Sequence, residues 1–311
     1  TKDRISFYSS ADIKNWIKES EFGDNLGAHG GVWECPDLFP VNHNGDTHWV
    51  LLVSINPGGP NGGSATQYFT GQFDGKNFTP YQTDTRWVDY GPDNYAGVTW
   101  SNTGKRKLFL GWMSNWQYAN LVPTFPWRSS MTVPRELDIR KIGDKLMLIS
   151  KPARELDVLN KKEIVLHEIE ASDFDLTSKT GNITGPYRLS IHSGKLETFT
   201  FTLSNELGEK VSFGYDKTTN QYFIDRSRSG HTGFEKGFGV KHTAPRLVQV
   251  DNIDMEMIID NSSLEIFADG GLSAMSALFF PGIDYSHVQI NSPGGFRIDT
   301  LTFHQMESSW K

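Results

Sequence analysis

The second half of the chain alternates between apolar and polar residues with the period of two that is typical of β-strands. Phe199, Phe201 and Leu203 would lie on one face of such a strand, and the threonines between them would lie on the other. Residues 211–215 repeat the alternation, and the polar turn at 217–220 leads into a further apolar run, as in a hairpin. Many short strands joined by frequent turns predict a β-sandwich.

The first half contains a loose internal repeat. Residues 7–16 and 68–78 each combine a short strand, a polar turn and an aromatic residue, and Asp12 and Asp74 are 62 positions apart (74 − 12). A third apolar group follows at 107–113. Groups of strands at this spacing suggest blades of a β-propeller, somewhat longer than the ~40–50 residues of commoner blade repeats. A chance similarity between two hairpins is the alternative interpretation.

The character of the pattern changes between residues 151 and 162, and helical periodicity is weak along the whole chain. We therefore predict an all-β protein of two regions. The first, residues 1–155, is part of a β-propeller. The second, residues 160–311, is a C-terminal β-sandwich.

Composition excludes several classes of partner. Thirty Lys and Arg residues against 37 Asp and Glu residues give a net charge of −7, which argues against nucleic acid or an anionic membrane as the main partner. No apolar run approaches the ~18 residues of a membrane span, and residues 49–53 fit a buried strand instead. Aromatic residues make up 13% of the chain, which suits aromatic binding surfaces on an all-β protein.

The sequence gives no sign of a metal or cofactor. The nine histidines show no metal-ligand spacing, and the glycine-rich run at 58–63 lacks the Lys-Ser/Thr of a phosphate-binding loop. The single cysteine, Cys35, cannot form an internal disulfide, so the redox compartment cannot be read from it. No Cys/His pair for nucleophilic catalysis is evident, and we expect Cys35 to be a small buried residue that packs behind Glu34.

Glu34 is the first candidate for acid/base chemistry. It stands between Trp33 and Cys35, and Pro36 follows. Apolar neighbours disfavour the charged form of a carboxyl group and raise its pKa, as a proton donor near neutral pH requires. The proline restricts the backbone just beyond and helps to fix the direction of the side chain.

Four blocks occur in the order seen in a known family: Trp-Glu-Cys-Pro-Asp at 33–37, Ser-Ile-Asn-Pro-Gly at 54–58, Gly-Trp-Met-Ser-Asn-Trp-Gln-Tyr at 111–118 and Pro-Trp-Arg-Ser at 126–129. Together they resemble glycoside hydrolase family 32, the family of invertases, levanases and exo-inulinases. Residues 223–227 and 264–267 resemble the sandwich domain of that family. The resemblance covers nearly the whole chain.

This resemblance implies a five-bladed propeller that hydrolyses β-fructofuranosyl bonds with retention, using three acidic residues. Glu34 corresponds to the general acid/base. The nucleophile and the transition-state-stabilising aspartate of the family lie in Asn-Asp-Pro and Arg-Asp-Pro blocks, and neither triplet occurs here. Four aspartates could conceivably replace these two residues, but none lies in a matching block: Asp3, Asp12, Asp37 and Asp93. We therefore expect the chain alone to be inactive.

Four further residues are candidate substrate contacts. Trp112 corresponds to the subsite for terminal fructose, where the C–H face of a furanose stacks on an indole; a core tryptophan is the alternative. Trp33 is a further candidate. Asn56 opens the glycine-rich loop and could contact sugar hydroxyls or serve only as a turn residue. Asp93 is expected to line the cleft or to bond near Glu34, with turn formation as the alternative. Trp116 is expected in the core or at the rim.

The resemblance implies an exo-acting enzyme on fructan or sucrose, with endo-acting levanase as the runner-up. A non-catalytic fructan-binding protein is the alternative from another class. The comparison also implies that the chain starts inside the third blade, so that its partner is an N-terminal propeller portion of the same enzyme. Open blades expose strand edges, and we expect the isolated chain to aggregate or to pair with that portion. A polymeric substrate favours an extracellular or periplasmic location.

Overall fold

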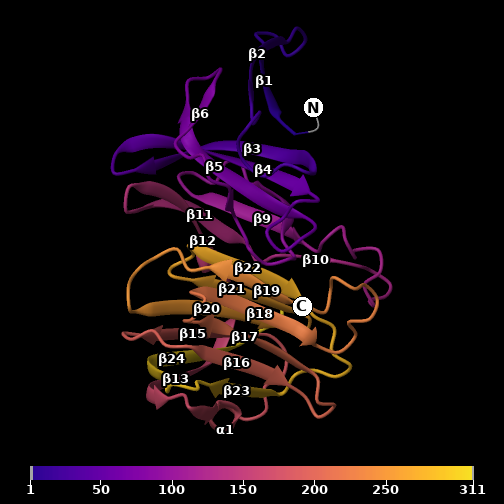
Figure 1. The fold of residues 1–311 in the computed structure, drawn as a ribbon, viewed down its shortest axis with the longest axis vertical. Coiled ribbons are helices and arrows are strands. Elements are labelled where there is room, and N and C mark those ends of the chain that lie inside the picture. The colour runs from indigo at the N-terminus through magenta and orange to yellow at the C-terminus, as the bar shows by residue number, and fades with distance from the viewer. Residues whose placement is uncertain (1–2, 310–311) are drawn as a thin grey trace.

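The computed structural model describes residues 3–309, and almost all of its regular secondary structure is β-strand (Figure 1). Three sheets from the first half of the chain stack at one end of the molecule, and two larger sheets form the other end (Figure 1). The prediction of an all-β fold with part of a propeller followed by a sandwich is confirmed. Residues 1–2 and 310–311, at the outer limits of the two predicted regions, lie outside the described residues.

The first half forms a hairpin and two five-stranded antiparallel sheets. The hairpin consists of β1 (Ile5–Ser9) and β2 (Ile17–Phe22). The next sheet contains β3 (Val32–His43), β4 (Asp46–Asn56), β5 (Ala65–Phe73), β6 (Phe78–Pro80) and β7 (Arg86–Trp87). The third contains β8 (Tyr95–Thr99), β9 (Lys107–Met113), β10 (Ser130–Met131), β11 (Arg135–Ile142) and β12 (Lys145–Pro152).

These sheets pack face to face, as propeller blades do. Val50 and Leu52 on one face of β4 join a buried cluster with Phe109 and Leu137 of the next sheet. Residues of alternate parity on the same strand pack on the other side, in the cluster that contains Phe22 of the hairpin. Because β4 is covered on both faces, its sequence reads as a continuous apolar run.

The internal repeat corresponds to two equivalent hairpin turns in successive sheets. Asp12, between β1 and β2, accepts hydrogen bonds from the backbone N–H groups of Lys14 and Asn15. Asp74, between β5 and β6, does the same for Lys76 and Asn77. The repeated aspartates therefore have a local structural role in the turn.

The second half is a sandwich of two six-stranded sheets that follows a short 3₁₀ helix at Arg154–Leu159. One sheet has the order β13 (Asn160–Glu170), β24 (Arg297–Met306), β15 (Tyr187–Ser193), β20 (Ile253–Asp260), β21 (Ser263–Ala268) and β22 (Ser273–Leu278). The other has the order β14 (Asp173–Asp175), β23 (His287–Asn291), β16 (Phe199–Ser204), β17 (Lys210–Asp216), β18 (Gln221–Arg228) and β19 (Lys241–Pro245), and α1 (Thr177–Thr180) follows β14.

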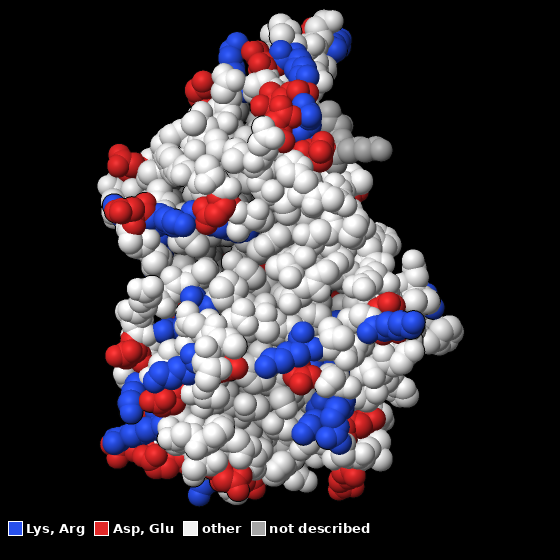
Figure 2. Space-filling view, in the orientation of Figure 1, with Lys and Arg blue, Asp and Glu red and all other residues white. Residues whose placement is uncertain are grey.

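The alternation along β16 has the predicted outcome. Phe199, Phe201 and Leu203 are completely buried in the sandwich core, while the threonines between them remain partly exposed. On the face shown in Figure 2, positive and negative side chains are interspersed over the sandwich, and neither sign forms a continuous stretch. Within the described residues, no helix is long and apolar enough to cross a membrane.

The loop between β7 and β8 joins the two halves by pairing with β22, the last strand of its sheet. Backbone N–H groups of Tyr90 and Asp93 donate to the carbonyls of Ala274 (2.8 Å) and Ser276 (3.1 Å). The Asp89 carboxylate accepts from Ser276 N at 2.8 Å, and the Asp93 carboxylate accepts from Leu278 N at 2.8 Å. The loop therefore satisfies the edge of the sheet that faces the propeller sheets.

Each half also supplies a buried arginine to this junction. Arg135 of β11 donates to Asp89 at 2.8 Å and, across the junction, to Glu265 of β21 at 2.6 Å. Arg226 of β18 donates to Asp93 at 2.7 Å. Both guanidinium groups have no solvent exposure. Each half thus contributes an arginine that pairs with a carboxylate of the other half.

We predict that Gly91→Ala destabilises the protein by about 2–4 kcal/mol, because a Cβ at this position would lie 2.2 Å from both N and O of Ser276. The measurement is urea unfolding followed by tryptophan fluorescence. Gly233→Ala is the matched control, since a Cβ there meets nothing within 4 Å. Equal stability of the two variants would contradict the close approach of the loop to β22.

His242 on β19 makes stability depend on pH. Burial and the charge of Arg226 lower its pKa from 6.5 to about 3. As the pH falls below 6.5, His242 takes up a proton in the unfolded chain, whereas in the folded chain it does so only near pH 3. The residue therefore lowers the free energy of unfolding progressively across that pH range. Between pH 7 and pH 4, we expect the free energy of unfolding of His242→Leu to fall by about 3 kcal/mol less than that of wild type.

This pH prediction is checked by urea unfolding at several pH values. The control is His231→Leu, which changes an exposed histidine and should retain the wild-type pH dependence. A pH dependence of His242→Leu identical to that of wild type would show that the buried imidazole is not the cause.

Candidate active site

A β-bulge in β3 sets the direction of Glu34. Glu34 pairs with Ser54 and Asp37 pairs with Leu52, so three steps along β3 match two steps along β4. The extra residue lies at Cys35–Pro36, and Cys35 has the left-handed φ of 48° that such a bulge accommodates. Because Ser54 and Leu52 share a face of β4, the bulge places Glu34 and Asp37 on one face of β3.

Both of these carboxylates are held by β8 of the neighbouring sheet. The Tyr95 hydroxyl donates a hydrogen bond to Oε2 of Glu34. Asp37 accepts from the backbone N–H of Thr99 at 2.6 Å and from its hydroxyl at 2.8 Å. Burial of the phenol and its bond to Glu34 raise the pKa of Tyr95, so it remains a hydroxyl donor across the neutral range.

Trp112 lies beside this pair. It is the cross-strand neighbour of Tyr95 on β9, and the two ring centroids are 6.3 Å apart. The ring of Trp116 follows at 5.1 Å from Trp112, and Trp116 is 51% exposed. Trp112 itself is half-buried, which leaves part of its indole open to a ligand. Because Trp116 is exposed, its expected placement in the core is wrong.

Asn56 is connected to the same region through the hydroxyl group of Ser64. It ends β4, and its side-chain oxygen accepts a hydrogen bond from Ser64 at 3.1 Å. The Ser64 hydroxyl in turn accepts from the backbone N–H of Trp116 at 3.0 Å. The structure therefore links Glu34, Trp112 and Asn56 through a continuous series of contacts.

Trp33 and Asp93 are placed differently. Trp33 is 5% exposed, donates its indole N–H to the carbonyl of Ala28 and packs in the core between the hairpin and the second sheet. Asp93 is fully buried at the junction between the two halves, where Arg226 and Tyr118 occupy its carboxylate oxygens. These positions leave neither side chain a surface for a sugar in the structure described.

The surroundings expected for Glu34 and Cys35 are also corrected. Glu34 does not lie in an apolar pocket, because its side chain is exposed on one side and bonded to Tyr95 on the other. Cys35 is exposed rather than packed behind Glu34. The reason is the bulge, which turns Cys35 out of the strand instead of into the sheet.

Tyr95 is the site residue that sequence reasoning missed. The signal available was its position at the start of an alternating strand, directly after a turn rich in Gly, Pro and Asp. That signal locates a strand end but names no partner, because Glu34 lies 61 positions earlier in the chain.

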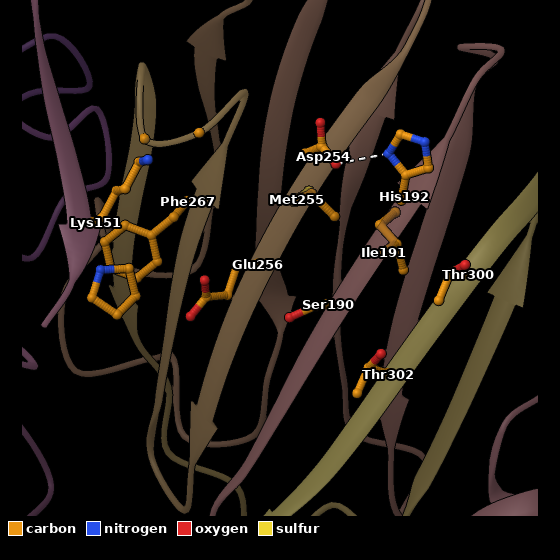
Figure 3. A pocket seen from close by; sticks show the side chains of 13 residues that line it. Lys151, Ser190, Ile191, His192, Asp254, Met255, Glu256, Phe267, Thr300 and Thr302 are labelled. Atoms are coloured by element: carbon orange, nitrogen blue, oxygen red, sulfur yellow. Dashed lines mark hydrogen bonds and ion pairs between the residues drawn. The ribbon is translucent and has the colours of Figure 1, made fainter. Parts of the chain in front are cut away.

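A concave region of the described surface lies away from Glu34. The concavity in Figure 3, of about 310 Å³, is formed by β12, β15, β20, β21 and β24, and His192 and Asp254 are bonded across it. None of the five predicted site residues lines it. Among residues 3–309 no group of three His, Cys, Asp or Glu side chains is arranged to hold a metal ion.

Comparison with known families agrees with this geometry. The profile described as glycosyl hydrolases family 32 N-terminal domain matches residues 1–152, and the profile for the family 32 C terminal matches residues 155–305. The chain belongs to glycoside hydrolase family 32. The predicted family is therefore confirmed, and the two matched segments correspond to the propeller sheets and the sandwich.

Individual family 32 proteins align over nearly the whole chain. Levanase from Bacillus subtilis is 36% identical over 99% of this chain, which covers 48% of the levanase. An extracellular exo-inulinase from Aspergillus niger is 35% identical over 99% of this chain, which covers 60% of that protein. The chain thus spans about half to three fifths of these relatives.

Solved structures of family 32 proteins show the same fold. The exo-inulinase from Aspergillus awamori has a TM-score of 0.89 at 30% identity, over 99% of this chain and 63% of that one. A β-fructofuranosidase from Schwanniomyces occidentalis, complexed with fructosyl-erythritol, has a TM-score of 0.85 at 28% identity, over 98% of this chain and 65% of that one.

The thiol beside Glu34 reports on the charge of this site. Although Cys35 is exposed, partial desolvation of its thiol by neighbouring atoms and the negative charge of Glu34 raise the pKa of Cys35. Glu34→Gln removes that charge and lowers the thiol pKa, so we expect alkylation by iodoacetamide at pH 8 to be about two- to threefold faster. Cys35 is the only cysteine, so the label is specific. Glu206→Gln, an exposed carboxylate in the sandwich, is the control, and equal rates in both variants would contradict the prediction.

Proposed function

We propose that this chain provides the acid/base half of a retaining β-fructofuranosidase that cleaves terminal fructose units from fructans. The observation that carries the proposal is the arrangement of Glu34, Tyr95 and Trp112 at one place in a family 32 fold. It supplies a proton donor, a group that orients the donor, and an aromatic face for a furanose.

In the proposed mechanism Glu34 protonates the oxygen of the leaving group and later activates water. Retention needs a second carboxylate about 5–5.5 Å away as nucleophile. Ionisation of that nucleophile favours the protonated form of its neighbour, and its conversion to an ester in the intermediate favours the ionised form needed for the base step. Tyr95 holds one oxygen of Glu34 through both steps.

We propose that the nucleophile and the stabilising aspartate come from a propeller portion outside these 311 residues. Three of the four conceivable replacements are already engaged in the structure. Asp12 binds its own turn, Asp37 binds Thr99, and Asp93 is buried against Arg226. The chain also spans only 48–60% of its curated relatives, which is consistent with a further portion.

The proposed substrate is a levan- or inulin-type fructan, with exo action. The support is similarity to proteins named levanase and exo-inulinase. Half-buried Trp112 would stack on the terminal fructose, exposed Trp116 would lie at the rim, and Asn56 would contact sugar hydroxyls. Endo action is the runner-up, and product analysis distinguishes the two: fructose alone for exo action, mixed oligosaccharides for endo action.

A chimera tests the proposed function. It joins the part of Bacillus subtilis levanase that precedes the matched region to Thr1 of this chain. We expect the chimera to release fructose from levan and the 311-residue chain alone to release none. Glu34→Gln in the chimera should lower kcat by about 10²–10⁴-fold, as loss of general acid/base catalysis does.

Three outcomes would count against the proposal. Fructose release by the 311-residue chain alone would show that its own residues include a nucleophile. A folded, inactive chimera that still binds levan would favour the non-catalytic fructan-binding alternative. Full activity of the Glu34→Gln chimera would remove Glu34 from the mechanism.

A further inference from the structure

Arg226 is a sandwich residue whose guanidinium group also bonds to the propeller side of the junction. It lies on β18 and has no solvent exposure. Its Nε donates to the carbonyl of Phe238 at 2.6 Å and one terminal nitrogen donates to the carbonyl of Leu278 at 2.9 Å, so the sandwich holds the guanidinium in place. The remaining donors reach Asp93 at 2.7 Å and the hydroxyl of Tyr118 at 2.9 Å.

Asp93 and Tyr118 belong to the two propeller segments that carry the sugar site. Asp93 is two residues before Tyr95, which holds Glu34. Tyr118 is two residues after Trp116 and follows Trp112 in the same segment. The Tyr118 hydroxyl also donates to Asp93 at 2.6 Å, so Arg226, Asp93 and Tyr118 form a closed triangle.

A second link makes the two segments one unit beside this triangle. The side-chain N–H of Asn115 donates to the carbonyl of Pro92 at 2.8 Å. Its oxygen accepts from the backbone N–H of Ser64 at 3.1 Å, at the start of the contacts that lead to Asn56. The positions of Tyr95, Trp112 and Trp116 therefore depend on how these two segments are held.

Three other arginines are buried among the described residues, and they differ in this respect. Arg86 bonds to Asp84 and to the carbonyl of Leu146 in the propeller region. The Arg135 side chain donates to Asp89 of the loop and to Glu265 and Ser276 of the sandwich, and its link to the strand that carries Trp112 is the backbone pairing of β11 with β9. Arg246 bonds to Tyr222 and Asp269 inside the sandwich and reaches neither segment. Arg226 is the arginine whose fork joins Asp93 and Tyr118, which lie 25 positions apart.

We propose that Arg226 is a positioning residue for the sugar site: it clamps the segment that ends in Tyr95 to the segment that carries Trp112 and Trp116. The sandwich is thus part of the construction of the active site. This inference rests on the proposed function only for its catalytic consequence, because the clamp itself is a property of the ligand-free chain. Displacements of about 1 Å at a catalytic group can lower rates by ~10²-fold, so such a clamp has functional weight.

The test compares Arg226→Met and Arg226→Lys with Arg246→Met in the 311-residue chain. The readout is the indole N–H resonances of Trp112 and Trp116 in ¹H–¹⁵N spectra, assigned by Trp112→Phe and Trp116→Phe. We expect both indole signals to move or broaden in Arg226→Met, and to move less in Arg226→Lys, which keeps the charge but loses the fork. Arg246→Met loses a comparable buried ion pair and should leave both signals in place.

Unchanged indole signals in a folded Arg226→Met would overturn the proposal, and so would equal changes in Arg226→Met and Arg246→Met. If Arg226→Met does not fold, Arg226→Lys is compared with Arg246→Met by the same criteria. Titration of the levanase chimera with fructose tests the proposed function separately. Indole signals of Trp112 and Trp116 that do not respond to fructose in the chimera contradict the proposed function, whereas the ligand-free spectra of the 311-residue chain decide the clamp.

Discussion

The edge of β22 is the constraint on which the arrangement of this protein depends. Its N–H and C=O groups face the propeller sheets and would be buried without partners if the two halves merely touched. The loop between β7 and β8 supplies those partners, with backbone N–H groups for the carbonyls and aspartate carboxylates for the N–H groups. Because Asp89 and Asp93 replace backbone carbonyls, each brings a negative charge into the junction. The buried arginines follow from that charge, since an unpaired buried carboxylate is strongly unfavourable.

This network determines geometry more than it adds stability. Burial raises the pKa of Asp93 and of Glu265, and the neighbouring arginines oppose that effect without cancelling it, so pairing offsets only part of the cost of desolvation. Removing a single partner is different, because the charge left behind has no solvent; losses of about 3–5 kcal/mol are typical. A junction with this asymmetry accepts one relative position of the two halves and penalises others. Tyr95 is the first residue of β8 and directly follows this loop, so the same junction determines where its phenol contacts Glu34.

How much the sequence predicted depends on whether a residue's partners are local. The sandwich could be predicted from the alternation of apolar and polar residues, because β16 is buried on one face and its apolar residues all lie on that face: Phe199, Phe201 and Leu203. Glu34 and Trp112 stood out because each lies in a contiguous block whose meaning is contained within a few residues. Asp93 also lies in a turn-like run, but Arg226 is 133 positions away, and no local pattern indicates such a partner. Cys35 was misplaced for a related reason, since a bulge depends on pairing between β3 and β4.

In the proposed mechanism, the bulge and Tyr95 together explain how an exposed carboxylate could act as an acid. Among the described residues, Tyr95 donates to Oε2 of Glu34, and Oε1 accepts no hydrogen bond. A general acid needs this asymmetry, with one oxygen held in place and the other available to carry and deliver the proton. The holding group comes from β8 of the next sheet and not from the strand that bears Glu34. In the proposed mechanism the direction of proton delivery is therefore set by the packing of two sheets, which the sandwich stabilises through the β7–β8 loop.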